Sequence, residues 1–302
     1  MNIIGKKNLY FLISSLVIVP GLISLILFGL RFSIDFTGGS LLELKIVSPK
    51  TRVGQEELQK VIEEENVTVG SIQSTDQDTY LFRLKEINKD KNQTLKKKIS
   101  DKFGTQVTEV RFETVGPVIG RELAQKSSLA IVVASIAVVL YISWAFSKVR
   151  KPASPWRFGI CAIIALIHDV LVVVGVFSLL GHFAKVEVDT LFVTALLTVI
   201  GFSVHDTIVV FDRIRENLSK MPGESFATVV NESILQTLVR SLGTSLTVVF
   251  TLFALLLFST GSLRWFIVAL LVGIVSGTYS SIFNAAPLLV LWHEWRNKKK
   301  KV

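Results

Sequence analysis

The strongest constraint on the fold is a set of six apolar runs, each long enough to cross a lipid bilayer. A helix needs about 20 apolar residues to span the hydrocarbon core. Half of the 302 residues are hydrophobic and the mean hydropathy is +0.54, which is too apolar for a soluble protein of this length. The expected spans are Leu9–Leu30, Leu129–Phe146, Phe158–Leu180, Leu191–Phe211, Ile234–Phe258 and Trp265–Trp292. The sequence therefore predicts a polytopic α-helical membrane protein.

The first run resembles a signal peptide, because Lys6 and Lys7 precede it. However, it is about 22 residues long and no A-x-A cleavage site follows. We therefore interpret it as a retained anchor. Cys161 is the sole cysteine, so neither an intrachain disulfide nor a cysteine metal cluster is expected.

Basic residues in short loops predict the orientation, because Lys and Arg concentrate on the cytoplasmic side. They gather at residues 6–7, 148–157 (Lys148, Arg150, Lys151 and Arg157), 213–220 and 296–301, whereas the short loops on the other side hold Lys185 and Arg264. Both termini should therefore be cytoplasmic. The expected organisation is a cytoplasmic N-terminus and first span (1–30), an extracytoplasmic domain (31–127) and a five-helix membrane domain with a basic tail (128–302). The net charge of +9 is then a topology signal, and no nucleic-acid partner is expected.

The polar segment 31–127 alternates between strand and helix patterns. Apolar residues two apart are typical of strands, and apolar residues three or four apart are typical of helices. In chain order, the expected elements are a strand at Leu41–Val47, a helix at Glu56–Glu64, strands at Val67–Ile72 and Tyr80–Leu84 around a turn that includes Gln77, a helix at Asn92–Phe103 and a strand at Val107–Val115. This β-α-β-β-α-β order predicts a ferredoxin-like α+β domain. Because it contains no His or Cys, we expect a binding or lever domain rather than an enzyme.

Two glycine motifs flank this domain. Asp35-Phe36-Thr37-Gly38-Gly39 predicts a tight turn next to the first span. A phosphate-binding loop is not expected there, because no Lys-Ser/Thr pair follows. Gly116-Pro117 should end the last strand, and it begins either a helix or a plain linker.

Ionisable residues inside the spans are the main functional candidates, because a charged group in hydrocarbon is costly unless it is neutral or paired. Asp206 lies in the fourth run and Arg240 near the start of the fifth. Both are six or seven residues from the same membrane face, so we expect them to meet at equal depth. Two interpretations stay open. The acid could exchange a proton and thereby couple to helix movement, or the two residues could form a static ion pair.

Further polar residues occupy the same part of the spans. His168 and Asp169 lie near the middle of the third run, and His205 precedes Asp206. A proton-path role and simple polar packing are both open for them. The sixth run has Gly273, Gly277 and Ser281 at a spacing of four, beside Ser276 and Ser280, which we interpret as a helix-packing surface. A zinc site at His168 and His205 lacks further ligands, and no G-x-S-x-G motif indicates a hydrolase.

Several of these motifs together resemble the SecF proteins of the SecD/SecF protein-export family. The motifs are Asp35-Phe36-Thr37-Gly38-Gly39, Val115-Gly116-Pro117, the run D-T-I-V-V-F-D-R-I-R-E-N at Asp206–Asn217 (with Thr207, Asp212 and Arg213), Asn231-Glu232-Ser233 and Arg240. The resemblance covers nearly the whole chain, and the run from Asp206 is its most specific part. Ser33 and His205 depart from the family pattern, which more often has Gly and Asn at these positions.

The resemblance implies a half-transporter similar to proton-driven RND pumps, with its membrane acid at Asp206 and its basic partner at Arg240. It implies SecD as the partner that completes a twelve-helix unit, together with the Sec channel, auxiliary Sec membrane proteins, an exported polypeptide and the bilayer. Such a pair would use the proton-motive force to help exported chains leave the channel at the bacterial cytoplasmic membrane. No cofactor, metal or enzymatic activity is implied. A small-molecule exporter and a scaffold of the translocon are the alternatives.

Overall fold

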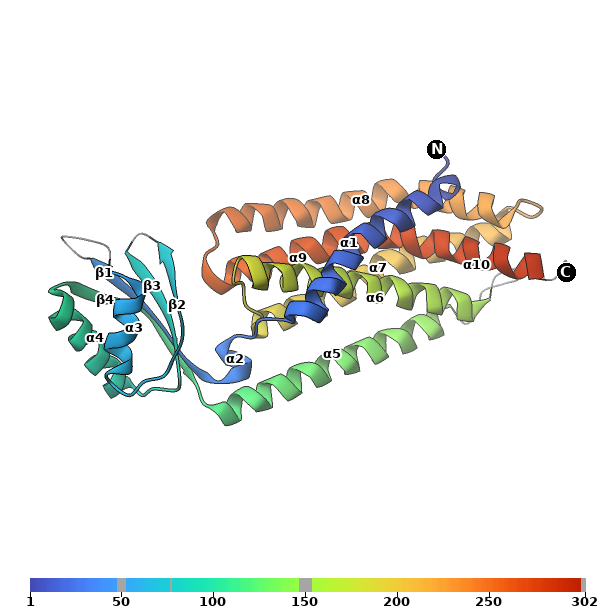
Figure 1. The fold of residues 1–302 in the computed structure, drawn as a ribbon. Coiled ribbons are helices and arrows are strands. Elements are labelled where there is room, and N and C mark those ends of the chain that lie inside the picture. Colours follow the sequence, from blue (N-terminus) through green and yellow to red (C-terminus); the bar gives the residue numbers. More distant parts are fainter. Residues whose placement is uncertain (48–52, 77, 147–153, 300–302) are drawn as a thin grey trace. The chain divides into compact units, whose positions relative to one another are not determined.

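The protein is seen in a computed structural model that describes residues 1–47, 53–76, 78–146 and 154–299. It divides into two compact units, one made of Met1–Arg31 with Ser128–Val302 and the other of Phe32–Ser127. The first unit is helical and the second contains the sheet (Figure 1). Some positions used for the topology and turn predictions lie outside the described residues: Lys148, Arg150, Lys151, Lys300, Lys301 and Gln77.

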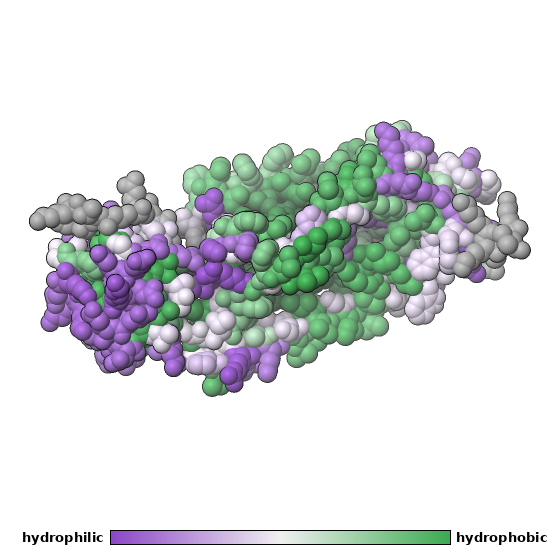
Figure 2. Space-filling view, in the orientation of Figure 1, coloured by the Kyte–Doolittle hydropathy of each residue, from purple (hydrophilic) through white to green (hydrophobic). Residues whose placement is uncertain are grey.

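Six helical segments in the described part of the chain are long and apolar enough to cross a membrane, which confirms the predicted six spans. They comprise a 3-10 turn (η1, Ile4–Lys6) with α1 (Lys7–Phe28), then α5 (Pro117–Ala145), α6 (Pro155–Phe183), α7 (Thr190–Lys220), α8 (Phe226–Phe258), and α9 (Gly261–Ser280) continued by a π-turn (η2, Ser281–Ala285) and α10 (Ala286–Lys299). Figure 2 shows hydrophobic residues over the helical unit and mainly hydrophilic residues over the other.

Most spans are longer than the apolar runs that predicted them, because polar residues continue each helix. Asp189 caps α7 by accepting a hydrogen bond from the Phe192 backbone N–H (2.8 Å), and Ser225 caps α8 through Thr228 N–H (3.1 Å). Pro117 opens α5 directly after the last strand, so Gly116-Pro117 begins a helix rather than a linker.

The second unit has the predicted ferredoxin-like order. Its elements are a short helix α2 (Ile34–Thr37), β1 (Gly39–Val47), α3 (Gln55–Glu63), β2 (Val69–Asp76), β3 (Thr79–Leu84), α4 (Lys89–Phe103) and β4 (Gln106–Val115). The sheet order is β2-β3-β1-β4 with antiparallel neighbours throughout, which is the split β-α-β arrangement. Its core is apolar and fully buried, with Leu42 and Leu44 from β1, Leu58 and Ile62 from α3, Phe82 from β3, and Leu95 and Ile99 from α4.

The glycine pair forms the predicted tight turn. Gly38 and Gly39 both have positive φ angles, of 74° and 122°. A Cβ on Gly39 would lie 2.8 Å from the Leu84 carbonyl oxygen, and one on Gly38 would lie 2.9 Å from the Cα of Pro117. Glycine is therefore required by backbone angle and by space at the point where β1, β3 and the start of α5 converge.

Small residues let the helices of the membrane unit approach closely. A Cβ on Gly175 of α6 would lie 2.8 Å from the Cα of Gly21 in α1. On α9, Gly273 packs against Val199 of α7, and Gly277 packs against Ser203. The predicted packing role in the sixth span is therefore confirmed for Gly273 and Gly277, which face α7.

The close approach of α1 and α6 generates the first prediction. We expect Gly175→Ala to destabilise the chain by about 1–3 kcal/mol, because the methyl group would force the two backbones apart. Thermal unfolding in detergent measures the effect. Gly243→Ala is the matched control, since a Cβ there meets no atom within 4 Å. Equal melting temperatures for Gly175→Ala and the parent chain would contradict the packing argument.

Candidate functional site

Asp206 lies inside the helical unit, on the face of α7 that packs against α8 and α9. It is 2% exposed. Its carboxylate accepts hydrogen bonds from Ser245 Oγ of α8 (3.3 Å) and Thr278 Oγ1 of α9 (3.2 Å). These two hydroxyls also lie 2.6 Å from each other. The acid therefore joins three spans through hydroxyl groups.

Asp169 of α6 is fully buried, and its carboxylate has more hydrogen-bond partners than that of Asp206. Ser203 Oγ of α7 donates to its Oδ2 at 2.5 Å, and Ser280 Oγ of α9 donates to the same oxygen at 2.7 Å. Ser276 Oγ, one turn earlier on α9, donates to Oδ1 at 2.7 Å. The His168 ring Nδ1 lies 3.0 Å from Oδ1. Three hydroxyls and an imidazole therefore surround this carboxylate.

Helix α9 lies between the two acids and donates hydrogen bonds to both of them. Ser276 and Ser280 are four residues apart and share one face, which contacts Asp169. Thr278 lies about 200° around the helix from Ser276, and it contacts Asp206 on the other side. A change in the rotation of α9 would therefore alter the hydrogen bonds of both acids together.

His168 continues the polar network toward α1. Its Nε2 lies 3.1 Å from Ser14 Oγ, and Asn284 Nδ2 donates to the same hydroxyl at 2.7 Å. An Nδ1–H that donates to Asp169 leaves Nε2 as an acceptor for Ser14. An open, mostly apolar groove of about 500 Å³ between α1, α6 and α9 is bordered by Ser14, His168, Ser276 and Tyr279, so the network reaches the surface of the bundle there.

The expected meeting of Asp206 and Arg240 is not seen. Among the described residues no ion pair joins them, and Arg240 is exposed on α8. Arg213 of α7 contacts Gln236 of α8 (2.6 Å), whereas Asp206 contacts Ser245. Arg240 is thus five residues from the level of Asp206, or ~7.5 Å along the helix. The prediction of equal depth was wrong because the register of α7 against α8 places Asp206 beside Ser245, and the ends of the apolar runs do not encode that register.

The remaining predicted residues divide between the core and the surface. His205 is exposed. Thr207 is buried, and its hydroxyl bonds the Ser203 carbonyl (3.1 Å) and lies 2.8 Å from Ser281 Oγ. Asp212 pairs with Arg215 (2.6 Å), and Arg213 pairs with Glu216 (2.6 Å).

The flanking motif positions lie in the other unit, where Asp35 and Phe36 form α2 and Gly38, Gly39, Gly116 and Pro117 shape the turns around it.

Sequence reasoning missed the hydroxyl groups that hydrogen-bond the buried acid Asp169 in this candidate site. Ser276 and Ser280 were interpreted as packing residues, yet they donate hydrogen bonds to Asp169. The signal was present, because polar side chains four apart in a span mark one face that needs a polar partner. Among the described residues no group of three His, Cys, Asp or Glu could hold a metal ion.

Comparisons with known proteins agree on one family. A family model described as protein export membrane protein SecD/SecF, C-terminal, matches residues 95–295, and a SecD/SecF GG motif model matches residues 23–50. The protein translocase subunit SecF of Thermobaculum terrenum is 48% identical over 97% of this chain and 94% of its own length. These matches confirm the resemblance seen in the motifs.

Fused relatives match as well. The protein translocase subunit SecDF of Bacillus subtilis is 33% identical over 98% of this chain, which spans 38% of that protein. A crystal structure of SecDF, a translocon-associated membrane protein, from Thermus thermophilus is 34% identical with a TM-score of 0.82 over 97% of this chain. This chain spans 39% of that one.

The hydroxyl shell of Asp169 generates a stability prediction. We expect Ser276→Ala to lower the free energy of unfolding by about 1–3 kcal/mol, because a buried acceptor loses its donor. The control is Thr198→Ala, whose exposed hydroxyl bonds only its own helix at Thr194 O (2.8 Å). Denaturant or thermal unfolding in detergent compares the two variants. Equal losses would show that the Asp169 shell contributes nothing specific.

Proposed function

Because the chain belongs to the SecD/SecF family of protein-export membrane proteins, we propose that it acts as an accessory subunit of Sec-dependent export that is driven by the proton-motive force. Its full-length relatives are named translocase subunits, and it is a multi-pass protein of the bacterial inner membrane. In this proposal it pairs with SecD, and the pair promotes the release of exported polypeptides after they have passed the channel.

The observation that carries the proposal is the burial of two carboxyl groups in the spans, with hydroxyls as their main partners. Asp206 and Asp169 are 2% and 0% exposed. Hydroxyls serve either protonation state, because they can donate to a carboxylate or accept from a carboxylic acid. A buried Arg or Lys in direct contact would instead lock the charged form. The shell around these acids therefore suits a group that gains and loses a proton.

Proton exchange would couple to helix position through α9. Protonation of Asp206 turns an acceptor into a donor, so the bonds from Ser245 and Thr278 must rearrange. Ser276 and Ser280 on the same helix hold Asp169. One charge that moves through 100 mV supplies about 2.3 kcal/mol, enough to shift a two-state equilibrium by more than tenfold.

A polar strip on the membrane unit supports SecD as the partner. It consists of exposed small or polar residues on α7 and α8: Thr194, Thr198, Gly201, His205, Arg240, Gly243, Thr244 and Thr247. Gln236, one turn before Arg240, contacts Arg213 of α7, so this face of α8 lies beside α7. Lipid would leave Arg240 unpaired, whereas a second helical subunit can supply an acidic or hydroxyl partner.

The neighbouring exposed face of α8, about 100° around the helix from the strip, is apolar, with Val239, Leu242, Leu246 and Phe250 at helical spacing. This face suits contact with lipid tails. We place the two termini in the cytoplasm and the α/β domain outside, from the basic loop residues. In that position the domain would meet the exported polypeptide, and the membrane unit would meet the Sec channel and auxiliary Sec proteins.

We expect Asp206→Asn to abolish most of the stimulation of export by a proton gradient, because an amide cannot exchange the proton. The measurement is the rate at which a reporter preprotein is exported in membrane vesicles with an imposed gradient, and we expect a decrease of about tenfold or more. The complex with SecD should still assemble. Asp212→Asn is the control, since Asp212 is exposed and paired at the surface.

Normal gradient-stimulated export by Asp206→Asn would refute the coupling role. In that case the buried acids would serve packing alone, and the chain would be a scaffold of the translocon.

The polar strip predicts where SecD docks. In a Cys161→Ala background, a cysteine introduced at Thr244 should crosslink to SecD in membranes. One introduced at Leu242, on the apolar face of α8 and about 160° around the helix from Thr244, should not. Both positions are exposed on the isolated chain, so the comparison separates proximity from reactivity. Crosslinking in the reverse pattern would assign the SecD interface to the apolar face.

A further inference from the structure

Arg157 in the first turn of α6 is an unexplained buried cation. It is 8% exposed, and among the described residues its guanidinium has no hydrogen-bond or ion-pair partner. Its guanidinium nitrogens are not among the fully buried polar atoms that lack a partner, so this mostly buried side chain presents unpaired donors at the surface. Neither the hydroxyl network around Asp169 nor the polar strip includes Arg157. Since the described residues supply no acceptor, Arg157 is available to an acceptor from outside them.

The groups near Arg157 make such an acceptor more favourable. Arg296 of α10 is close enough to repel it electrostatically. His293 of α10 is also within electrostatic range, and its Nδ1 is buried with no hydrogen-bond partner. Asn297 Nδ2 lies 2.9 Å from the other ring nitrogen, Nε2. When the amide donates to Nε2, the imidazole proton is on Nδ1, which then adds one more unpaired donor.

The acid that lies near His293 is already engaged. Glu294 of α10 accepts a hydrogen bond from Lys7 Nζ at 2.5 Å. The start of α6 adds positive character, because Ser154 at the N-cap makes no side-chain capping bond. Helix N-termini attract anions through their free N–H groups and the helix dipole. In the described part of the chain, these groups thus form a cluster of donors without an acceptor: Arg157, Arg296, His293 and the start of α6. We name it the anion cluster.

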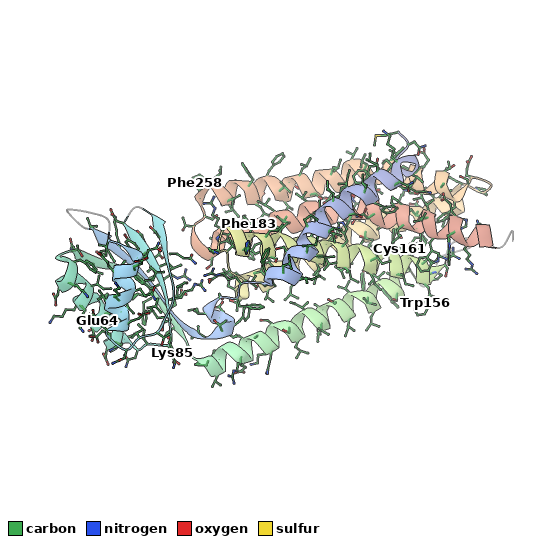
Figure 3. All side chains as sticks on the ribbon, viewed as in Figure 1. Glu64, Lys85, Trp156, Cys161, Phe183 and Phe258 are labelled. Atoms are coloured by element: carbon green, nitrogen blue, oxygen red, sulfur yellow. The ribbon has the colours of Figure 1, made fainter. Side chains whose placement is uncertain are left out.

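Two exposed tryptophans indicate the depth of the anion cluster in the bilayer. Trp156 is 77% exposed and Trp295 is 55% exposed, and they flank the cluster on α6 and α10. Exposed tryptophans collect at the level of the lipid headgroups. Figure 3 shows Trp156 near the start of α6, with Cys161 one turn further along, and Figure 1 places the C-terminal end of α10 at the same end of the helical unit. The phosphate groups of membrane lipids lie at this depth.

We propose that the anion cluster binds the phosphate group of an anionic phospholipid. Arg157 would contact the phosphate through two parallel N–H donors, as a guanidinium can and an ammonium cannot. Arg296 and His293 Nδ1 would complete the site from α10. Basic pockets between spans are the expected places for anionic headgroups. The bound lipid would join α6, which carries Asp169, to α10. The inference does not rest on proton coupling.

The experiment uses the purified full-length chain in detergent. Thermal unfolding is followed while phosphatidylglycerol, phosphatidylcholine or inorganic phosphate is added, and native mass spectrometry counts the retained lipids. The variants are Arg157→Gln and Arg296→Gln, and the second keeps the test valid if the first folds poorly, since Arg296 is exposed. Arg264→Gln, an exposed arginine at the start of α9, is the matched control.

We expect phosphatidylglycerol to raise the melting temperature more than phosphatidylcholine does. Arg157→Gln and Arg296→Gln should each weaken the apparent affinity for phosphatidylglycerol by about tenfold or more, and Arg264→Gln should leave it unchanged. Equal stabilisation by the two lipids, or equal affinities in all three variants, would overturn the proposal. Full stabilisation by inorganic phosphate, with no further effect of phosphatidylglycerol, would overturn the assignment to a lipid.

Discussion

The membrane unit depends on how it accommodates the carboxyl group of Asp169 away from water. An acid in that position requires donors, and donors can come only from neighbouring spans. Ser203 of α7 and the pair Ser276 and Ser280 of α9 provide them. These hydroxyls can reach the acid because Gly277 lets α9 approach α7 at Ser203. The small residues and the polar residues therefore act together. Glycine allows the helices to approach closely, and at that distance the serine hydroxyls can hydrogen-bond the acid.

The same logic explains why α9 connects the two acids. Its residues alternate between partners, with Thr278 toward Asp206 and the flanking serines toward Asp169. A helix that packed by apolar contacts alone could slide with little directional preference. Hydrogen bonds to two fixed acids give α9 a defined rotation and depth. They also make that rotation sensitive to the protonation of either acid, as the proposed export role requires.

The sequence was sufficient for the fold because the fold depends on local pattern. Six apolar runs, the β-α-β-β-α-β order and the angles required of Gly38 and Gly39 are all visible along the chain. The site was only half predictable. Asp206 and Asp169 were found because an acid in a span is costly wherever it points. The level of Arg240 was missed because it depends on the offset between α7 and α8, which the apolar runs do not encode. The hydrogen bonds to Asp169 were not predicted, because a serine in a span is equally compatible with close helix packing and with donating a hydrogen bond.

The π-turn at Ser281–Ala285 gives the sixth span a property that a regular helix lacks. Each ring of a π-turn holds one residue more than an α-helical ring, so the turn stores a surplus residue in the middle of the span. If the π-turn shifted by one residue toward the N-terminus, the side chain of the residue that it passes would rotate by about 100° around the helix axis. The other backbone hydrogen bonds of the span would stay intact. Ser280 is the residue directly before it, and it bonds Asp169. A one-residue shift of the π-turn would therefore reorient Ser280 relative to Asp169 without moving α10.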